Sequence, residues 1–208
     1  MTPLRYFLQS RNGFRNVYAV TGTPVDAAKF ALRGLMPRMP DLLFSGINRG
    51  ENSGVNLLYS GTVAGAMEGA IIGIPSIAVS IAWTKHSDHI TEYSTAARFA
   101  RQLAVKVLTE GLPFGTMLNV NVPNAAEKDL KGVMMTGQAE SHYHEIIDKR
   151  SDPRGNEYFW ISGINTMVED KIDSDMKAVR EGYIAVTPVC ARLTDEKFLQ
   201  ELKGWVLE

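Results

Sequence analysis

Short apolar runs alternate with segments of helical periodicity through the first 123 residues. Four runs have the length and composition of strands, at residues 17–20, 41–45, 76–81 and 117–122. Between them, apolar positions at helical spacing predict helices that follow Thr23, that run from about residue 60 to residue 69, and that span residues 93–110. Strands and helices in this order predict an α/β fold, with a mostly parallel sheet covered by helices on both faces.

The first predicted helix has a defined start. Thr23 can cap it, Pro24 suits its first position, and Asp26 completes a capping box three residues after the cap. The apolar run at residues 41–45 is short and continuous, which is typical of a parallel strand that is covered on both faces. This run leads directly into a glycine-rich loop.

The second half of the chain has a different pattern. Two strand-like runs, at residues 142–147 and 158–161, flank a segment at residues 151–156 that has the composition of an exposed turn. We expect a protruding hairpin whose aromatic surface would be exposed in a monomer, which indicates pairing of subunits. The aromatic residues of the hairpin are Tyr143, Tyr158, Phe159 and Trp160. A further strand is expected at residues 183–187, and Thr194 is expected to cap a final helix.

Composition limits the classes of function. The 208 residues, 45% hydrophobic and 22% charged, are enough for one domain, spanning residues 1–208, with one sizeable core. The formal charge of −1 is spread along the chain without a basic block, which argues against polymeric nucleic acid as a partner and is compatible with one small phosphorylated ligand. No signal peptide or membrane span is evident, so a cytoplasmic location is expected. The single cysteine, Cys190, is expected to be a small buried residue.

The glycine-rich loop, Ser45-Gly-Ile-Asn-Arg-Gly-Glu-Asn-Ser-Gly54, is the main candidate for a site. It follows a predicted buried strand, and ligands of open α/β sheets bind at the carboxyl ends of the strands. Its glycines allow a ligand to approach the main chain. The side chains of Asn48 and Asn52 add amide groups that can coordinate a cation through oxygen or donate to a phosphate.

A helix start shortly after this loop adds a second feature. Tyr59-Ser-Gly-Thr-Val63 opens the helix, so unpaired backbone N–H groups and the positive end of the helix dipole are available to an anion. The hydroxyls of Ser60 and Thr62 are further donors. Loop and helix start together describe a phosphate site beside a possible metal. The alternative is that the glycines form turns, one hydroxyl caps the helix, and the asparagines are solvated.

The reaction class follows from what the loop contains and lacks. It matches neither the Walker A pattern nor Gly-x-Gly-x-x-Gly, so an NTPase is disfavoured. Hydrolysis of a phosphate monoester with a divalent ion suits the site better. Such an ion prefers carboxylates, however, and Glu51 is the only one in the loop. An unrelated phosphate-sugar enzyme that uses the same helix terminus without a metal is a further interpretation.

Other polar clusters were considered as sites, and a solvated surface is the favoured interpretation for most of them. The candidates are His86 and His89 with Asp88 between them, His142 and His144 on the hairpin, and Asp170, Asp173 and Asp175. Two interpretations of Glu68, inside the second helix, stay equally open. It orients an amide of the loop, or it lies on the solvent-exposed surface of the helix.

Three motifs in order resemble the signature of the SurE family. They are Thr21-Gly-Thr-Pro-Val-Asp26, Ser45-Gly-Ile-Asn-Arg-Gly50 and Tyr59-Ser-Gly-Thr-Val-Ala-Gly-Ala-Met-Glu-Gly69. Leu118-Asn-Val-Asn-Val-Pro123, the aromatic hairpin and Lys177-Ala-Val-Arg-Glu-Gly-Tyr183 resemble the same family. The similarity covers nearly the whole chain.

This resemblance implies a Rossmann-like phosphatase that uses a divalent metal ion, Mg²⁺ or Mn²⁺, to release phosphate from nucleoside 5′- and possibly 3′-monophosphates. By motif position, Asn48 is the family's metal-ligating asparagine. The residues that receive the phosphate are by the same resemblance Asn52, Ser60, Gly61 and Thr62. A homodimer or homotetramer is implied, with a hairpin arm at about residues 141–162 and a C-terminal helix at residues 194–206 as its oligomerisation elements.

The N-terminus departs from the family pattern. SurE proteins open with a strand that ends in Asn-Asp-Asp-Gly, whose two aspartates ligate the metal, and a serine ligand follows. None of these residues has an equivalent here, so an N-terminally truncated domain is expected and the catalytic residues are not identified. The alternative function is a catalytically silent module that binds a nucleotide or phosphate, or serves in assembly.

Overall fold

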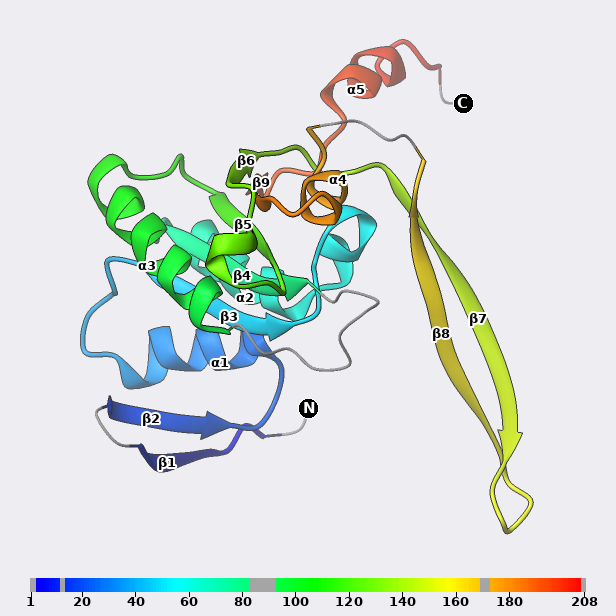
Figure 1. Cartoon of the computed structure of the whole chain (residues 1–208), viewed down its shortest axis with the longest axis horizontal. Helices are drawn as coiled ribbons and strands as arrows, with labels where there is room; N and C mark the ends of the chain where they lie inside the picture. The colour runs from blue at the N-terminus through cyan, green and yellow to red at the C-terminus, as the bar shows by residue number, and fades with distance from the viewer. Residues whose placement is uncertain (1–2, 12–13, 83–92, 169–172, 207–208) are drawn as a thin grey trace.

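A five-stranded sheet forms the centre of the computed structural model, which describes residues 3–11, 14–82, 93–168 and 173–206 (Figure 1). Its strands, in spatial order, are β3 (Leu43–Arg49), β4 (Ser76–Ala82), β5 (Thr116–Pro123), β9 (Ile184–Cys190) and β6 (Val133–Met135). The pairs β3–β4, β4–β5 and β9–β6 are parallel, and β5–β9 is antiparallel. The predicted α/β fold with a mostly parallel sheet is therefore confirmed.

Helices cover both faces of this sheet. The helical elements of the described residues are α1 (Pro24–Phe30), which continues as the π-helix η1 (Ala31–Leu35), α2 (Gly61–Ile71), α3 (Tyr93–Glu110), α4 (Asp175–Arg180), the 3₁₀ turns η2 (Gly54–Tyr59) and η3 (Glu127–Asp129), and α5 (Glu196–Leu202), which lies away from the sheet (Figure 1). Side chains of β4 alternate between the faces, as period two requires. Ile77, Val79 and Ile81 pack with α3, whereas Ala78 packs with α2 and Ala82 with α4.

The first strand-like run does not join the central sheet. It lies in β2 (Phe14–Val20), which pairs antiparallel with β1 (Tyr6–Arg11) in a separate two-stranded sheet. This hairpin lies on the far side of α1 from the central sheet (Figure 1), and the Tyr6 and Phe30 ring centroids are 5.1 Å apart. Because β2 pairs with its sequence neighbour, β3 is left as an edge strand.

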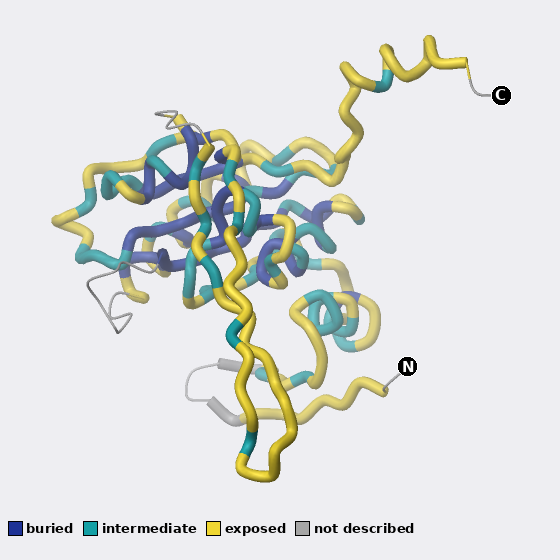
Figure 2. The backbone as a smooth tube through the Cα atoms, turned by 90° about the vertical axis from the view of Figure 1, so that its right-hand side faces the viewer, coloured by how far each residue is buried: buried dark blue, intermediate teal, exposed yellow. Residues whose placement is uncertain are grey.

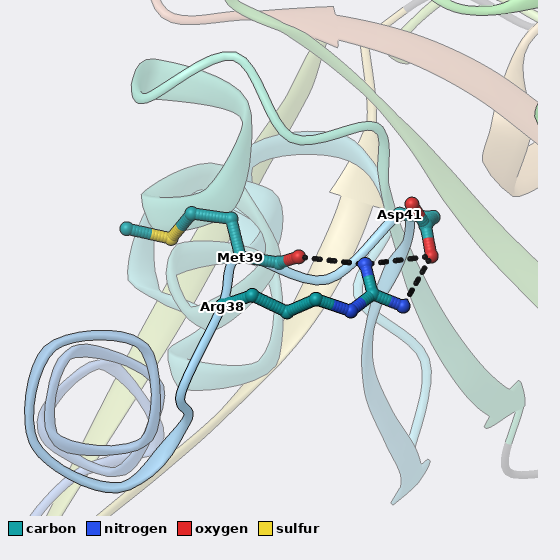
Figure 3. A network of polar contacts seen from close by, with 3 residues as sticks. All are labelled: Arg38, Met39 and Asp41. Carbon is teal, nitrogen blue, oxygen red and sulfur yellow. Dashed lines mark hydrogen bonds and ion pairs between the residues drawn. The ribbon is translucent and has the colours of Figure 1, made fainter.

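The parallel strand expected at residues 41–45 is present as β3, but the expectation that it is covered on both faces is wrong. Burial alternates along β3, and the Phe44 side chain is 45% exposed, so the strand is not covered on both faces. A groove of about 390 Å³ runs between α1 and β3. Arg38 lies in the turn that leads into β3 and donates to the Met39 carbonyl and the Asp41 carboxylate, at 3.4 Å each (Figure 3).

The predicted hairpin is a long arm. Its strands β7 (Ser141–Ser151) and β8 (Glu157–Met167) pair along their whole length and extend away from the sheet (Figure 1), beyond the expected end at residue 162. Most residues of the arm are exposed to solvent (Figure 2). The final helix, Glu196–Leu202, is shorter than the expected residues 194–206. The prediction that Thr194 caps it is wrong, because the Asp195 carboxylate accepts the Phe198 N–H at 2.9 Å.

Several local predictions are decided by the structure. The capping box of α1 is confirmed, since Thr23 and Asp26 bond each other's main chain at 3.2 and 2.9 Å. The prediction that Cys190 is buried is wrong: it lies exposed near the end of β9, where the strand leaves the core. None of the helices in the described residues combines the length and apolar character that crossing a membrane requires.

Candidate functional site

Three polar side chains occupy one register row at the carboxyl end of the parallel strands. Asn48 of β3 pairs with Ser80 of β4, and Ser80 pairs with Asn121 of β5. A register shift between Ser45 and Asn48 brings the asparagine into this row. The Asn48 side-chain amide donates to the Gly50 carbonyl at 2.9 Å, which fixes the start of the loop. The predicted site loop thus leaves the sheet at the ligand-binding edge.

Asn52 is more deeply held than an exposed loop residue would be. It is 8% exposed, and its side-chain amide donates to the Ser80 hydroxyl at 2.6 Å. Its main chain is bonded on both sides: the N–H donates to Asn121 Oδ1 at 2.8 Å, and the carbonyl accepts from Asn119 Nδ2 at 2.8 Å. The interpretation of Asn52 as a solvated loop residue is therefore excluded.

The first turn of α2 lies beside β3 and the start of α1. A Cβ on Gly61 would lie 3.3 Å from the Pro24 ring, and one on Gly65 would lie 2.8 Å from Ser45 Oγ. Ser60 is the N-cap, and its hydroxyl accepts the Val63 N–H at 3.1 Å. Thr62 is buried at 9% exposure. Because first-turn N–H groups have no acceptor inside a helix, those of Gly61 and Thr62 suit an anion.

Two carboxyl groups lie behind the loop. Asp175 is completely buried and accepts hydrogen bonds from the N–H groups of Gly54, Ala139 and Met176. Burial raises the pKa of Asp175, and these N–H donors oppose the shift. Desolvation also raises the pKa of Glu51, and the nearby charge of Asp175 raises it further. The Ser53 side chain has the opposite effect and lowers this pKa. The expectation that Asp175 belongs to a solvated loop is wrong, because α4 begins there and buries it.

A divalent ion does not fit the residues gathered here. Within the described ranges, no group of three or more His, Cys, Asp or Glu side chains is close enough to hold a metal. Asn48 offers one neutral amide oxygen, and the Asp175 carboxylate is directed at main-chain N–H groups. Mg²⁺ and Mn²⁺ require several oxygen ligands that include carboxylates. The geometry supports the phosphate half of the predicted site better than the metal half.

The remaining candidates that the structure describes are not part of this site. Glu68 forms an ion pair with Lys29 of α1, at 3.6 Å, which favours its interpretation as helix surface. His142 and His144 are exposed on the arm, and Asp173 is exposed before α4. Four candidates lie outside the described residues: His86, Asp88, His89 and Asp170.

Sequence reasoning missed the asparagines of β5. Asn119 and Asn121 are both completely buried, and they bond the main chain of the site loop. A signal was present in the sequence, since two amide residues at period two share one face of an otherwise apolar strand. Buried amides need partners, and the loop at the strand end is the nearest source of unpaired main-chain groups.

Comparisons with known proteins agree on one family. A sequence profile described as Survival protein SurE matches residues 1–145. The chain is 45% identical over 207 residues to the 5'-nucleotidase SurE of Chlorobium phaeobacteroides, covering 100% of this chain and 79% of the relative. It is 49% identical over 189 residues to that of Symbiobacterium thermophilum, covering 91% and 72%. The crystal structure of the SurE protein from Aquifex aeolicus has a TM-score of 0.77 and 38% identity, covering 97% of this chain and 79% of that one.

Proposed function

The chain belongs to the SurE family, and on that premise we propose that it acts as a phosphatase on nucleoside 5′-monophosphates, with 3′-monophosphates as a second substrate class. One observation carries the proposal: the first turn of α2 and the asparagine-bearing loop both lie at β3, on the ligand-binding edge of the sheet. The relatives that bear the name 5'-nucleotidase supply the substrate class.

The proposed phosphate-binding residues are Asn52, Ser60, Gly61 and Thr62. The main-chain N–H groups of Gly61 and Thr62 would donate to phosphate oxygens, aided by the positive end of the α2 dipole. The buried Thr62 hydroxyl would add a donor within a partly desolvated surface. The second hydrogen of the Asn52 amide, whose first goes to Ser80, would supply another. Together these groups bind and orient a phosphoryl group.

SurE nucleotidases depend on a metal in general, and Mg²⁺ or Mn²⁺ is the proposed ion. Such an ion would supply a water of lowered pKa and neutralise charge on the phosphoryl group. Asn48 is the residue of this chain proposed to contribute a ligand. Since the described residues around Asn48 do not complete a divalent site, the proposed chemistry of this chain's own residues is limited to binding and orienting the phosphate.

Phosphate release from 5′-AMP, measured with Mn²⁺, with Mg²⁺ and with EDTA, tests the proposed activity. The proposal predicts release with a divalent ion, no release in EDTA and slower release in Asn48→Ala, because Asn48 is the proposed ligand. Arg38→Ala is a matched control, because Arg38 is exposed and its contacts are confined to the turn before β3. Equal rates in EDTA, or no loss in Asn48→Ala, would contradict the proposal.

A second candidate is a silent nucleotide-binding module. The absence of an acidic cluster among the described residues favours this candidate, because the same absence disfavours a metal site. Calorimetry separates the two candidates. Binding of 5′-AMP that is indifferent to EDTA, without phosphate release under any divalent ion, would support the silent module. Binding that requires the ion, with turnover, would support the phosphatase.

The arm is proposed to assemble the chain into a homodimer or homotetramer. Its apolar residues near the tip are exposed, with Phe159 at 55%, Trp160 at 57% and Ile161 at 73%. An extended two-stranded ribbon with such a surface is marginally stable in water without further packing. Association with a second copy would cover these side chains, and α5, which also projects from the sheet (Figure 1), is proposed to take part.

A further inference from the structure

The segment Asn52–Val55 is held by side chains from distant parts of the chain. The sheet ladder ends before this segment, so its main-chain polar groups need other partners. Six side chains provide them, from β5, from the strand-to-arm connection, from the arm and from α4. They are Asn119, Asn121, Gln138, Ser141, Asn165 and Asp175.

Asn121 makes the most specific of these contacts. Its Oδ1 accepts the Asn52 N–H at 2.8 Å, while its Nδ2 donates to the Asn52 carbonyl at 3.2 Å. Asn119 donates to the same carbonyl at 2.8 Å. A side chain that accepts and donates at once is required here, and an amide supplies both functions where a carboxylate supplies only acceptors. The two asparagines thus fix the peptide groups on either side of Asn52.

The other end of the segment is fixed in the same way. Asp175 accepts the Gly54 N–H at 3.1 Å, and Gln138 Nε2 donates to the Gly54 carbonyl at 3.0 Å. The Val55 N–H donates to Ser141 Oγ at 2.8 Å, at the base of the arm. The segment includes the first two residues of η2, Gly54 and Val55, and η2 leads into the N-cap of α2. Its position therefore sets where Asn52 and the first turn of α2 lie.

We propose that Asn121, with Asn119, Ser141 and Asp175, are positioning residues that hold the phosphate-binding loop in its binding conformation. The inference rests on the proposed function and goes beyond it, because none of these four side chains is proposed to touch the substrate. Their contacts preorganise Asn52 and the α2 start, so that phosphate binding does not have to order them.

The test compares Asn121→Leu with a control variant in the same sheet. Thr187→Val is the matched control, because Thr187 is 2% exposed, pairs in register with Asn119, and bonds Thr136 at 2.8 Å instead of the loop. Inorganic phosphate affinity is measured by calorimetry, and kcat and KM for 5′-AMP are measured with Mn²⁺, below the melting temperature of every variant. Ser141→Ala is a milder variant, since Ser141 is only half-buried.

Asn121→Leu is expected to weaken phosphate binding and to raise KM about tenfold, because a displaced loop binds phosphate less well. The kcat of this variant should stay within about twofold of the value for the unchanged chain. Ser141→Ala is expected to show the same pattern at about threefold, and Thr187→Val to leave both quantities unchanged. A merely structural role would instead reduce the active fraction, which lowers kcat at constant KM.

The outcomes separate the inference from the proposed function. If the unchanged chain neither binds phosphate nor releases it, the proposed function is contradicted, and the inference is overturned with it. If the unchanged chain does bind phosphate, while Asn121→Leu and Ser141→Ala match Thr187→Val, the inference alone is overturned. Should Asn121→Leu fail to fold, the comparison of Ser141→Ala with Thr187→Val decides.

Discussion

Gly46, within β3, and Gly50, where the chain leaves β3, have similar backbone angles, with φ of +129° and +110°, but different surroundings. A Cβ on Gly46 would overlap the main-chain carbonyl oxygen of Val79 in β4, whereas one on Gly50 meets open space. We expect Gly50→Ala to cost about 1 kcal/mol of unfolding free energy from the unfavourable φ alone, and Gly46→Ala to cost about 3 kcal/mol or more, because the strands must separate.

Denaturant unfolding of the two variants checks this prediction. The matched φ values make Gly50→Ala the control for backbone strain, so the difference between the variants isolates the steric overlap. Equal losses in the two variants would show that β3 and β4 do not approach each other as closely as described.

Glu51 gives a prediction on pH. Burial raises the pKa of Glu51 above its ordinary value of 4.5, with the Asp175 charge acting in the same direction. The unfolded chain therefore loses this proton at a lower pH than the folded chain does. The folded state loses stability as pH rises from about 4.5 through the raised pKa of Glu51, because ionised Glu51 is disfavoured in the folded state. Glu51→Gln removes that cost. The melting temperature of Glu51→Gln relative to the parent should therefore increase between pH 4 and pH 7, as measured by calorimetry.

A control of opposite sign is available on the arm. Hydrogen bonds from the side chain and main chain of Asn156 lower the pKa of the exposed Asp152 below 3.8. Asp152→Asn should therefore lose relative stability as pH rises toward 3.8 from below, and show a constant difference above it. A difference between Glu51→Gln and the parent that is constant from pH 4 to pH 7 would contradict the raised pKa of Glu51.

At this scale, the sequence indicates candidates whose role depends on local chemistry. Asn48 and Asn52 are such candidates, because amides beside glycines at a strand end are typical of a site, and their roles stay predictions. The contacts of Asn121 and Asp175 with the loop could not be predicted, since the loop partners lie 69 and 121 residues away from them in the chain. Whether a polar residue is solvated or buried against a distant loop depends on tertiary packing, which spacing along the chain does not encode.

Helix α2 links the site to the core, and its N-cap provides a prediction at the scale of elements. Ser60→Ala removes the bond to the Val63 N–H and should cost about 1 kcal/mol of stability, together with a loss of phosphate affinity, because the first turn frays. Asp195→Ala removes the equivalent cap of α5, which lies away from the sheet (Figure 1). It should leave phosphate affinity unchanged.

Urea unfolding and phosphate calorimetry on both variants measure these effects. The cap and the anion site are formed by the same turn of α2, so stability and affinity should fall together in Ser60→Ala. Unchanged phosphate affinity in Ser60→Ala would contradict the placement of the phosphate at this turn.

Element boundaries were predictable where capping and periodicity agree. The expected helix at residues 93–110 matches α3, and the capping box of α1 is present. The environment of β3 was not predictable, because a short apolar run has the same pattern whether the strand is central or at an edge. The pairing of β1 with β2 decides the matter, and that pairing is a property of the assembled sheets.

The shape of the whole molecule, a globular α/β body with a long projecting arm, gives a prediction on assembly. Replacing Phe159, Trp160 and Ile161 by threonine should convert an oligomer to a monomer, because these side chains are exposed in one chain and would be covered by another. Thermal stability of the α/β body should change little. Light scattering coupled to size-exclusion chromatography measures the mass, and a parent chain that is already monomeric would contradict the proposed assembly.

The α/β class was predictable at this scale, since alternation of periodicity determines it, whereas the length of the arm was not. The strand-like runs at residues 142–147 and 158–161 are shorter than β7 and β8, which extend to Ser151 and Met167. The additional paired residues are polar, or are apolar residues without apolar neighbours, so no hydrophobic pattern predicts a strand there. Continuous antiparallel pairing between β7 and β8 holds them in the arm.

The central claim is that the loop before η2 and the first turn of α2 bind the phosphate of a nucleotide. An NMR titration of the isotopically labelled chain with 5′-AMP, and separately with adenosine, tests it most directly. The account predicts that 5′-AMP shifts the backbone amide signals of Gly61 and Thr62 and of the segment Asn52–Val55, and that adenosine does not. Shifts confined to the arm, or equal shifts with adenosine, would contradict it.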